Sequence, residues 1–426
     1  NWLVLRIKPE GEDWLSIDSV ELLSYRQELS LRNGMLCREV RARHGDGRIT
    51  RWTERRLVGM HDAHIAAISV EITTENWTGG LTICSALDGT VRNRGVARYR
   101  KLADHHTRCI SAGELAEDTI QLIARSKQSR IEVAEAARTS VFRDGSHVTP
   151  VVRTVERDDW IGQELDVEVH AGSPLRLEKI VAFGTSRDRG ISESGYETAR
   201  TVATAGRFDQ ILASHALSWQ ALWDEFDFGL DTPGNSATVL KLRVHIFHLL
   251  QTVSPHTLGT DAGVPARGWH GEAYRGHVFW DEIFMLPLLN LRQPLLTKAM
   301  LRYRYRRLRE ARRAARAAGF RGAMFPWQSG SDGREESQRI HLNPKSGHWT
   351  ADITHLQRHI SAAVAYCTWQ YYEVTANQEF LTMHGAELFL EIARFWASIA
   401  EYNEAIDRYE IKGVMGPDEF HTGYPD

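Results

Sequence analysis

The chain has 426 residues, of which 25% are charged and 42% are apolar, and its formal net charge is −3. This composition is typical of a soluble globular protein with two or three domains and a large core. The small net charge does not favour nucleic acid as a partner. No apolar run reaches the ~18 residues that a membrane span requires, so no membrane association is predicted.

The four cysteines form no CxxC pair and have no regular spacing. Neither a disulfide framework nor a structural zinc site is expected, and no metal site is predicted. Reduced thiols are typical of the cytoplasm, which is the location we expect. Arginines outnumber lysines by 44 to eight, and this bias lowers the weight that any single arginine cluster should carry.

Residues 1–185 contain short runs of alternating apolar and polar residues, a pattern typical of β-strands. Turn sequences such as RNG, HGDG and LDGT separate them. The runs are WLVLRI, MLCREVRAR, RITRWTERRLV, HIAAISVEI, LTICSAL, TIQLIARS, IEVAEAARTSVF, ELDVEV and RLEKIVAF. Many strands without intervening helices predict an antiparallel β-sandwich.

The pattern becomes helical near Ser192. Helical spacing continues until DTPGNSA at 231–237 breaks the chain, and a strongly apolar helix, TVLKLRVHIFHLLQTV, follows it. The apolar residues of the first helical stretch are Val202, Phe208, Ile211, Leu212 and Leu217. We predict an α+β multidomain protein with a β-sandwich at 1–190, a helical linker at 191–232 and an all-α domain at 233–426, whose helix pairs surround a cavity.

The stretch GWHGEAYRGHVFWDEIFMLPLLN, residues 268–290, places charge and aromatic rings at the start of an apolar helix. Asp281 is expected at or near the helix N-terminus, where a carboxylate is tolerated as a cap. The alternative is a carboxylate that accepts hydrogen bonds from sugar hydroxyls, beside the stacking face of Trp280. Arg275 is either a second substrate ligand or the structural partner of Asp281 or Glu282.

Residues 322–349 form a stretch of about 28 residues with almost no helical periodicity. Loops of this length within compact domains are often functional. The candidates for substrate binding here are Trp327, Glu335 and Glu336. The alternative is a solvated surface loop, although the aromatic side chains of Phe325 and Trp327 argue against full exposure.

Two histidines, His355 and His359, are four residues apart, which is the spacing of a metal-ligand pair on one helical face. The HExxH sequence is absent, and no third ligand is evident. The pattern therefore favours a pair of helix-face histidines with satisfied hydrogen bonds, or a contribution to the rim of a pocket.

The arginine-rich segment RYRYRRLREARRAARAAGFRG, residues 302–322, is expected to form an outer helix. Its buried face is predicted to carry Tyr303, Leu308, Ala311 and Ala315, with the arginines on the solvated face. A contact with nucleic-acid phosphates is the less favoured alternative.

Near the end of the chain, YEIKGVM leads into Gly416-Pro417-Asp418-Glu419. Pro417 fixes its own backbone, so the loop should be stiff. Adjacent residues do not face the same way, so one acid should point into a cavity while the other holds the loop. Burial among aromatic rings raises the pKa of a carboxyl group and keeps it protonated as a proton donor.

Three stretches together resemble glycoside hydrolase family 65, which includes maltose, trehalose and kojibiose phosphorylases and some α-glucoside hydrolases. They are GEAYRGHVFWDEIFMLP, GVMGPDEFH and QYYEVTANQEFLTMHGAELFLEIARFWAS. The resemblance implies a β-sandwich, linker helices and the first part of an (α/α)6 barrel. It also implies that Glu419 is the general acid, that Trp280 and Asp281 hold the transferred glucosyl unit, and that Arg275 and Trp327 line the same subsite.

The resemblance further implies inverting phosphorolysis of an α-linked glucose disaccharide to β-glucose 1-phosphate and a sugar. Inorganic phosphate is the co-substrate, no cofactor is expected, and a homodimer is predicted. One alternative is an inverting α-glucoside hydrolase whose general base lies beyond residue 426. Another is a non-catalytic carbohydrate-binding fragment, because the family extends past both ends of this sequence and the chain is expected to be incomplete.

Overall fold

The computed structural model describes residues 1–230, 236–269 and 271–418. The chain divides into two compact units. The first unit comprises Asn1–Arg92 and Ala103–Gly229, and the second comprises Asn93–Leu102 and Leu230–Asp426.

This division differs from the predicted domain boundaries in two respects. The helices that were expected to form a separate linker belong to the β-rich unit. The short segment Asn93–Leu102, which follows a strand in the sequence and precedes another, belongs to the helical unit. The β-rich unit therefore contributes its own covering helices, and the helical unit contains one segment from early in the chain.

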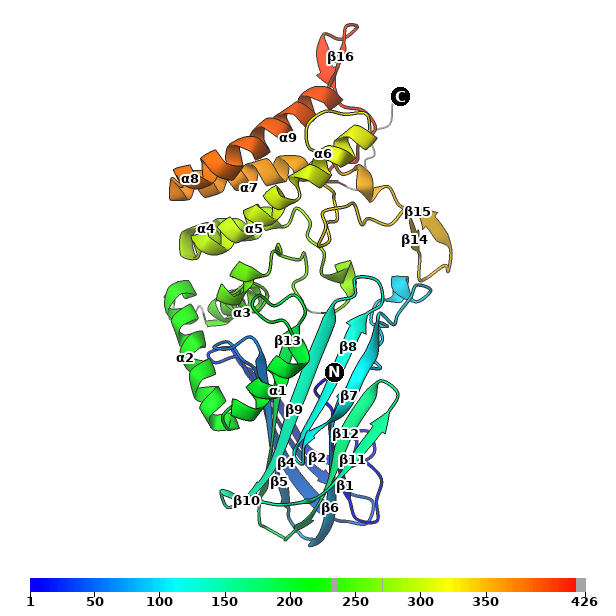
Figure 1. Ribbon diagram of the computed structural model, residues 1–426, viewed down its shortest axis with the longest axis vertical. Helices are drawn as coiled ribbons and strands as arrows, with labels where there is room; N and C mark the ends of the chain where they lie inside the picture. The colour runs from blue at the N-terminus through cyan, green and yellow to red at the C-terminus, as the bar shows by residue number, and fades with distance from the viewer. Residues whose placement is uncertain (231–235, 270, 419–426) are drawn as a thin grey trace. The chain divides into compact units, whose positions relative to one another are not determined.

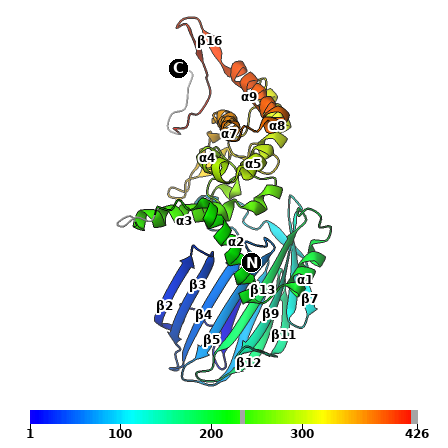
Figure 2. The same ribbon diagram turned by 90° about the vertical axis from the view of Figure 1, so that its left-hand side faces the viewer.

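Two antiparallel sheets form the β-rich unit (Figures 1 and 2). The smaller sheet has the order β1-β6-β12-β11, and the larger has the order β2-β3-β4-β5-β13-β9-β8-β7, with β10 paired to β9. The strands are β1 (Leu5–Pro9), β2 (Glu21–Ser30), β3 (Met35–Arg43), β4 (Ile49–Val58), β5 (Ile65–Thr74), β6 (Gly79–Asp88), β7 (Thr107–Ala116), β8 (Thr119–Ser126), β9 (Glu132–Arg143), β10 (Ser146–Val148), β11 (Val151–Arg157), β12 (Trp160–Val169) and β13 (Leu175–Thr185). Each predicted run overlaps one of these strands, and the antiparallel architecture is confirmed.

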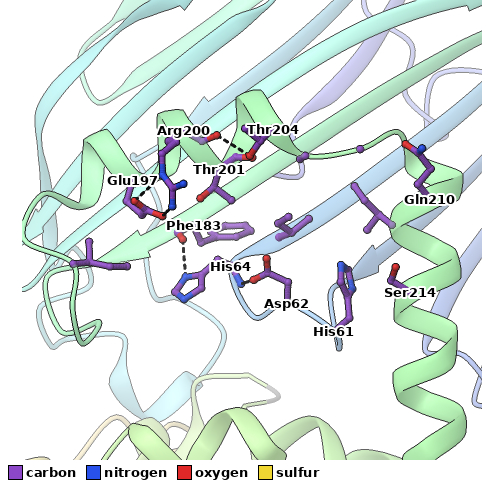
Figure 3. Close-up of a pocket in the computed structure, with 15 residues that line it drawn as sticks. His61, Asp62, His64, Phe183, Glu197, Arg200, Thr201, Thr204, Gln210 and Ser214 are labelled. Carbon is purple, nitrogen blue, oxygen red and sulfur yellow. Dashed lines mark hydrogen bonds and ion pairs between the residues drawn. The ribbon is translucent and has the colours of Figure 1, made fainter.

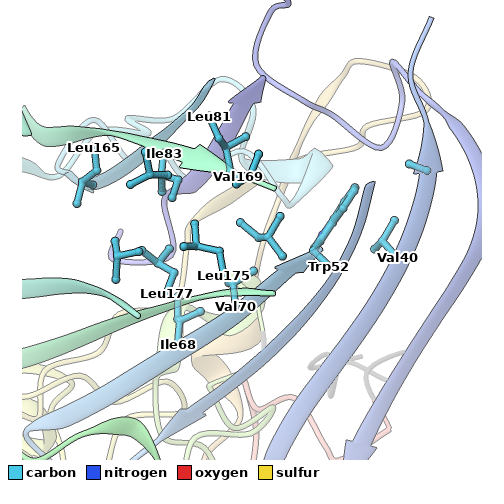
Figure 4. Close-up of a cluster of buried hydrophobic side chains, with 14 of the residues drawn as sticks. Val40, Trp52, Ile68, Val70, Leu81, Ile83, Leu165, Val169, Leu175 and Leu177 are labelled. Carbon is cyan, nitrogen blue, oxygen red and sulfur yellow. The ribbon is translucent and has the colours of Figure 1, made fainter. Parts of the chain in front are cut away.

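The hydrophobic core of this unit lies between the two sheets (Figure 4). Leu81 and Ile83 of the smaller sheet point towards Ile68, Leu175 and Leu177 of the larger one, and all five side chains are almost completely buried. Successive side chains of a strand point to opposite faces. The period-two apolar pattern therefore places these residues in one layer, and each contributes roughly 1.5–3 kcal/mol of burial free energy.

The opposite face of the larger sheet is covered by α1 (Ser194–Thr204) and α2 (Phe208–Phe226). Phe208 and Ile211 of α2 pack against Ala67 of β5 and Ile180 of β13. Both faces of β5 and β13 are thus buried, which explains the continuous apolar runs at residues 65–68 of β5 and 180–183 of β13. The prediction that Leu217 shares this apolar face is wrong, because its side chain is 72% exposed. Leu217 follows Phe208 by two and a half helical turns, so it projects from the opposite side of α2.

The helical unit is built on α4, α5 and α7, which pack against one another, and on α6 and α9 (Figure 1). Its helices are α3 (Ser236–Thr252), α4 (Glu282–Arg292), α5 (Pro294–Arg306), α6 (Leu308–Ala317), α7 (Ile360–Thr375), α8 (Gln378–Phe380) and α9 (Ala386–Ile399). Its short strands are β14 (Ile340–Leu342), β15 (Trp349–Ala351), β16 (Glu401–Asn403) and β17 (Arg408–Glu410). None of the helices in the described ranges has the length and apolar character needed to cross a bilayer.

The arginine-rich segment forms α5 and α6 with a change of direction at Arg307. The predicted buried face, which includes Tyr303 and Leu308, is confirmed. The prediction that the arginines are all solvated is wrong for Arg304 and Arg307, which are 1% and 8% exposed. Both guanidinium groups pair with carboxylates of the same unit, Arg304 with Glu282 and Arg307 with Asp261, and this pairing compensates for their burial.

Candidate active site

The loops of the helical unit enclose a cavity of about 640 Å³, a volume within the range of small-molecule sites. Four residues that the sequence predicts to bind substrate lie together in its wall: Arg275, Trp280, Asp281 and Trp327. The complete lining is Arg98, Tyr99, Ala266, Arg267, Tyr274, Arg275, Phe279, Trp280, Asp281, Trp327, Gln328, Gln338, Asp352 and Thr354.

Aromatic rings form one wall of the cavity. The ring centroids of Trp280 and Trp327 are 6.2 Å apart, and Phe279 meets Trp327 edge-on at 5.6 Å. His359 lies against both tryptophans, with centroid distances of 4.9 and 5.0 Å. Rings packed in this way present a rigid apolar surface that suits the C–H face of a sugar.

Asp281 is the residue immediately before α4, as predicted, but its side chain makes no capping hydrogen bond to the helix. Burial raises the pKa of the Asp281 carboxyl group, and the neighbouring charge of Glu282 adds to that increase. The structure therefore does not support a helix-capping role for the side chain. The carboxyl group is free to accept hydrogen bonds from hydroxyl groups of a ligand beside Trp280.

Glu282 faces the protein interior, in contrast to its neighbour Asp281. Its carboxylate accepts hydrogen bonds from Arg304 at 2.9 and 3.1 Å and from the backbone N–H of Val264 at 3.2 Å. Arg304 also donates to the carbonyl oxygen of Phe279 at 2.9 Å. This buried pair fixes the start of α4 and thereby positions the adjacent Asp281.

Arg275 does not pair with either of these acids in the structure. Its guanidinium carbon lies 5.1 Å from the centroid of Tyr99, over the ring. Arg275 and Tyr274 both have left-handed backbones, with φ values of 55° and 60°. Such conformations are strained for residues other than glycine, and they cluster at ligand sites. The strain here turns the loop so that both side chains line the cavity.

Two family models match the chain in order. The N-terminal domain of glycosyl hydrolase family 65 matches residues 1–222, and the central catalytic domain of the same family matches residues 243–426. The chain belongs to glycosyl hydrolase family 65. The family expected from the sequence is confirmed, and the cavity lies in the part of the chain that matches the central catalytic domain, apart from Arg98 and Tyr99.

Relatives within family 65 are similar along the whole chain. An uncharacterised glycosyl hydrolase of Mycobacterium tuberculosis is 45% identical over 425 residues, which are 100% of this chain and 32% of the relative. A kojibiose phosphorylase of Halothermothrix orenii is 32% identical over 435 residues, covering 99% of this chain and 54% of the relative. The chain thus spans between about a third and about half of the length of these relatives.

A solved structure shows the same fold. A proposed kojibiose phosphorylase from the human microbiome matches 99% of this chain, and the match covers 52% of that protein, with a TM-score of 0.81 and 20% identity. At this identity the likeness shows the fold, namely an antiparallel β-sheet domain followed by a helical region.

Two other acids predicted to bind substrate, Glu335 and Glu336, are not among the residues that line the cavity. The Glu335 carboxylate accepts hydrogen bonds from the backbone N–H groups of Trp327, Gln328 and Ser337 at 2.8, 3.2 and 3.1 Å. Glu335 therefore holds the loop that carries Trp327, and substrate contact by either acid stays a prediction. The prediction that the aromatic side chains keep this loop from full exposure is confirmed, since Trp327 is only 9% exposed.

The histidine pair does not share a helical face, which corrects the prediction from their spacing. His355 lies in a short 3-10 turn, Thr354–Leu356, and His359 immediately precedes α7, which begins at Ile360. The helical spacing rule does not apply across this change of backbone. His359 instead packs against Trp280 and Trp327. It is not among the residues that line the cavity, so a contribution to the pocket rim stays a prediction.

Glu419, the predicted general acid, lies outside the described residues. The described chain approaches that position through Met415, whose backbone N–H donates to the carbonyl oxygen of Leu356 at 3.1 Å. Leu356 is close in sequence to Asp352 and Thr354, which line the cavity. The catalytic role of Glu419 stays a prediction.

Several lining residues were not singled out in the sequence analysis, among them Arg98, Tyr99 and Arg267. Arg98 and Tyr99 come from Asn93–Leu102, which lies among strands in the sequence yet belongs to the helical unit. The run GVARYR, residues 95–100, has no periodicity that would connect it to a site. Its charged and aromatic residues next to a turn were the available hint.

A second cavity, of about 480 Å³, lies in the β-rich unit between α1, α2 and the sheet (Figure 3). Its polar groups are largely paired with one another. Glu197 binds Arg200 at 2.6 Å, and His64 Nδ1 lies 2.9 Å from the carbonyl oxygen of Phe183. These contacts are internal, so Glu197, Arg200 and His64 already have partners within the cavity wall.

Asp281→Asn is expected to raise the stability of the protein near neutral pH. The pKa of Asp281 is raised by burial, so ionisation of this group is harder in the folded than in the unfolded protein. Stability conferred by the aspartic acid is therefore lost as the pH rises above its ordinary pKa of 3.8. Thermal unfolding midpoints measured between about pH 4 and 7 should increasingly favour the variant as the pH rises.

The control is Asp46→Asn, because the pKa of Asp46 is lowered by the backbone N–H of Arg48. Its variant should lose relative stability as the pH rises towards about 4 and should show little further change between about pH 4 and 7. A profile of Asp281→Asn that is as flat as that of the control between about pH 4 and 7 would contradict the assignment of Asp281 as a desolvated carboxyl group.

Proposed function

We propose that the protein is an inverting phosphorylase that converts an α-glucosidic disaccharide and phosphate to β-glucose 1-phosphate and a free sugar. The observation that carries this proposal is the position of Trp280 and Asp281 beside Trp327, in a cavity of disaccharide size within the family 65 catalytic domain. A stacking surface next to a buried hydrogen-bond acceptor is what recognition of a glucosyl ring requires.

In the proposed mechanism, protonated Glu419 donates its proton to the glycosidic oxygen as the bond to the anomeric carbon breaks. Positive charge develops at that carbon. Phosphate attacks the opposite face and forms the new C–O bond, so the configuration inverts and no protein base is needed. Asp281 holds the sugar hydroxyls, and this positioning supplies part of the rate.

The use of phosphate is supported by the relatives that are named phosphorylases, among them the kojibiose phosphorylase of Halothermothrix orenii. We propose inorganic phosphate as co-substrate with no further cofactor, and a homodimer in the cytoplasm as in the sequence-based prediction. The reaction test described below determines which disaccharide, and which linkage, the protein cleaves.

We also propose that the helical unit is the first part of an (α/α)6 barrel. Large apolar side chains on three of its helices are exposed: Phe284 and Leu291 on α4 and Leu295 on α5, at 71, 71 and 63%, and Leu390 on α9 at 62%. Exposed apolar faces of this extent favour further packing. Additional helices of a closed barrel would supply it.

The test uses the intact gene product and a panel of glucose disaccharides with and without phosphate. The expected result is that the disaccharide is cleaved only when phosphate is present, with release of β-glucose 1-phosphate. NMR of the initial product identifies the anomer. Release of glucose from the disaccharide at the same rate with and without phosphate would overturn phosphorolysis and favour an inverting hydrolase.

A further inference from the structure

Three arginines, Arg98, Arg267 and Arg275, line the cavity that contains Trp280 and Asp281. We refer to the three as the arginine rim. All three side chains are exposed in part, so their guanidinium groups are accessible from the cavity. They come from separate segments of the helical unit, and the fold brings them to one cavity.

The segment that carries Arg98 is anchored to the helical unit by Glu272. Its carboxylate accepts hydrogen bonds from the backbone N–H groups of Arg94 and Gly95 at 3.0 and 2.8 Å. Two backbone contacts to one carboxylate fix the direction of the chain just before the turn Ala97–Tyr99. The position of Arg98 is therefore built into the fold.

The other two arginines are also held in place. The backbone of Pro265 pairs with Val278 and accepts a hydrogen bond from Gly268, which closes the turn that carries Arg267. Arg275 is held by its left-handed backbone and by its contact with the Tyr99 ring at 5.1 Å. Guanidinium groups on fixed turns lose less freedom on binding a ligand than those on mobile chains.

The cavity supplies no obvious counter-charge for the arginine rim. Among the described residues, no carboxylate lies within 4.0 Å of its three guanidinium groups. Of the two acids in the lining, Asp352 already accepts hydrogen bonds from the backbone and hydroxyl of Thr354 at 3.0 and 2.7 Å. Asp281 has a raised pKa because it is buried. The lining thus has an excess of positive charge.

Arginine is abundant in this protein, so pairing elsewhere in the unit is the relevant comparison. Arg304, Arg307 and Arg312 each contact a carboxylate of another segment at 2.6 to 3.0 Å. Arg309, on the exposed surface of α6, has no ion pair among the described residues, but it lines no cavity. Convergence on a cavity, rather than abundance, distinguishes the arginine rim.

We propose that the arginine rim binds a phosphoryl group of the ligand that occupies this cavity. Planar guanidinium groups bind phosphate oxygens with paired, charge-assisted hydrogen bonds. The inference rests on the proposed function and extends it to the substrate class. The phosphoryl group is carried either by the leaving sugar, as a sugar phosphate, or by inorganic phosphate.

The test measures binding to the intact gene product by calorimetry, with glucose, glucose 6-phosphate and inorganic phosphate as three separate probes. Arg98→Gln and Arg267→Gln remove one charge each from the arginine rim, and Arg309→Gln is the control with the same change of charge. Thermal melting establishes that each variant is folded. Binding does not require turnover, so the result is independent of whether phosphorolysis occurs.

Loss of a charged hydrogen bond should weaken binding of the phosphorylated probe by at least about tenfold. If the wild-type protein binds glucose 6-phosphate more tightly than glucose, and both rim variants lose this preference, the ligand is a phosphorylated sugar. If the rim variants weaken the binding of inorganic phosphate but not that of glucose 6-phosphate, the ligand is the free anion. Affinities within about twofold of the Arg309→Gln control for both probes would overturn the inference. If the phosphorylated probe still binds through the arginine rim but turnover does not depend on phosphate, the proposed function is overturned. The inference about the arginine rim then still stands.

Discussion

Glu419→Gln is expected to lower kcat by about 10²–10⁴-fold while sugar binding is largely retained. The amide has nearly the same shape as the carboxyl group but carries no transferable acidic proton. The glycosidic oxygen would then leave without protonation, which raises the barrier to bond cleavage. Initial rates of phosphorolysis, together with calorimetric binding of the disaccharide, measure the two effects separately in the intact gene product.

A substrate with a good leaving group distinguishes proton donation from a structural role. α-Glucosyl fluoride needs less protonation than a disaccharide, so Glu419→Gln should impair its cleavage much less. Asp418→Asn, the adjacent acid with the same change of charge, is the matched control and should have a smaller effect on kcat. Wild-type turnover of the disaccharide by Glu419→Gln would remove this residue from the proposed mechanism.

Arg304→Met is expected to destabilise the protein by about 3–5 kcal/mol. The pair formed by Arg304 and Glu282 is almost completely buried, with side-chain exposures of 2% and 7%. Removal of the guanidinium group leaves the Glu282 carboxylate without its charged partner in the interior. It also removes the donor to the carbonyl oxygen of Phe279. The free energy of unfolding in denaturant, followed by tryptophan fluorescence, measures the loss.

Recovery in a double variant separates an unpaired charge from a simple loss of packing. Glu282→Leu combined with Arg304→Met removes both charges, so it should be considerably more stable than Arg304→Met alone. The control is Arg313→Met, which removes an exposed pair with Glu310 and should cost less than about 1 kcal/mol. A double variant as unstable as the single one would show that the charge of Glu282 is not the cause.

Strand positions in the β-rich unit were largely predictable because side-chain burial follows the pleat. In β5 and β13 the apolar residues contact the core or the covering helices, and this leaves a clear pattern in the sequence. Strand β2 was not predictable, since its side chains are mostly exposed, Leu22 and Tyr25 included at 43% and 46%. Backbone pairing with β3, rather than burial, maintains that strand.

Part of the candidate site was predictable for a local reason. Trp280 and Asp281 are adjacent at a helix start, so any fold that forms α4 brings them together. The loop around Trp327 was recognisable from its length and aromatic content. The role of Glu335 in holding that loop depends on three backbone N–H groups whose orientation no periodicity reveals.

Residue type and spacing alone thus determine which side chains share a strand face, where α4 begins and which family the chain resembles. The partners of the charged groups are decided in three dimensions: Arg304 with Glu282, Arg275 over Tyr99, and Arg98 beside Arg267 in one cavity. The reason is the short range of these interactions. Hydrogen bonds and ion pairs require approach to about 3–4 Å and vary strongly with burial, and both depend on segments far apart in the chain.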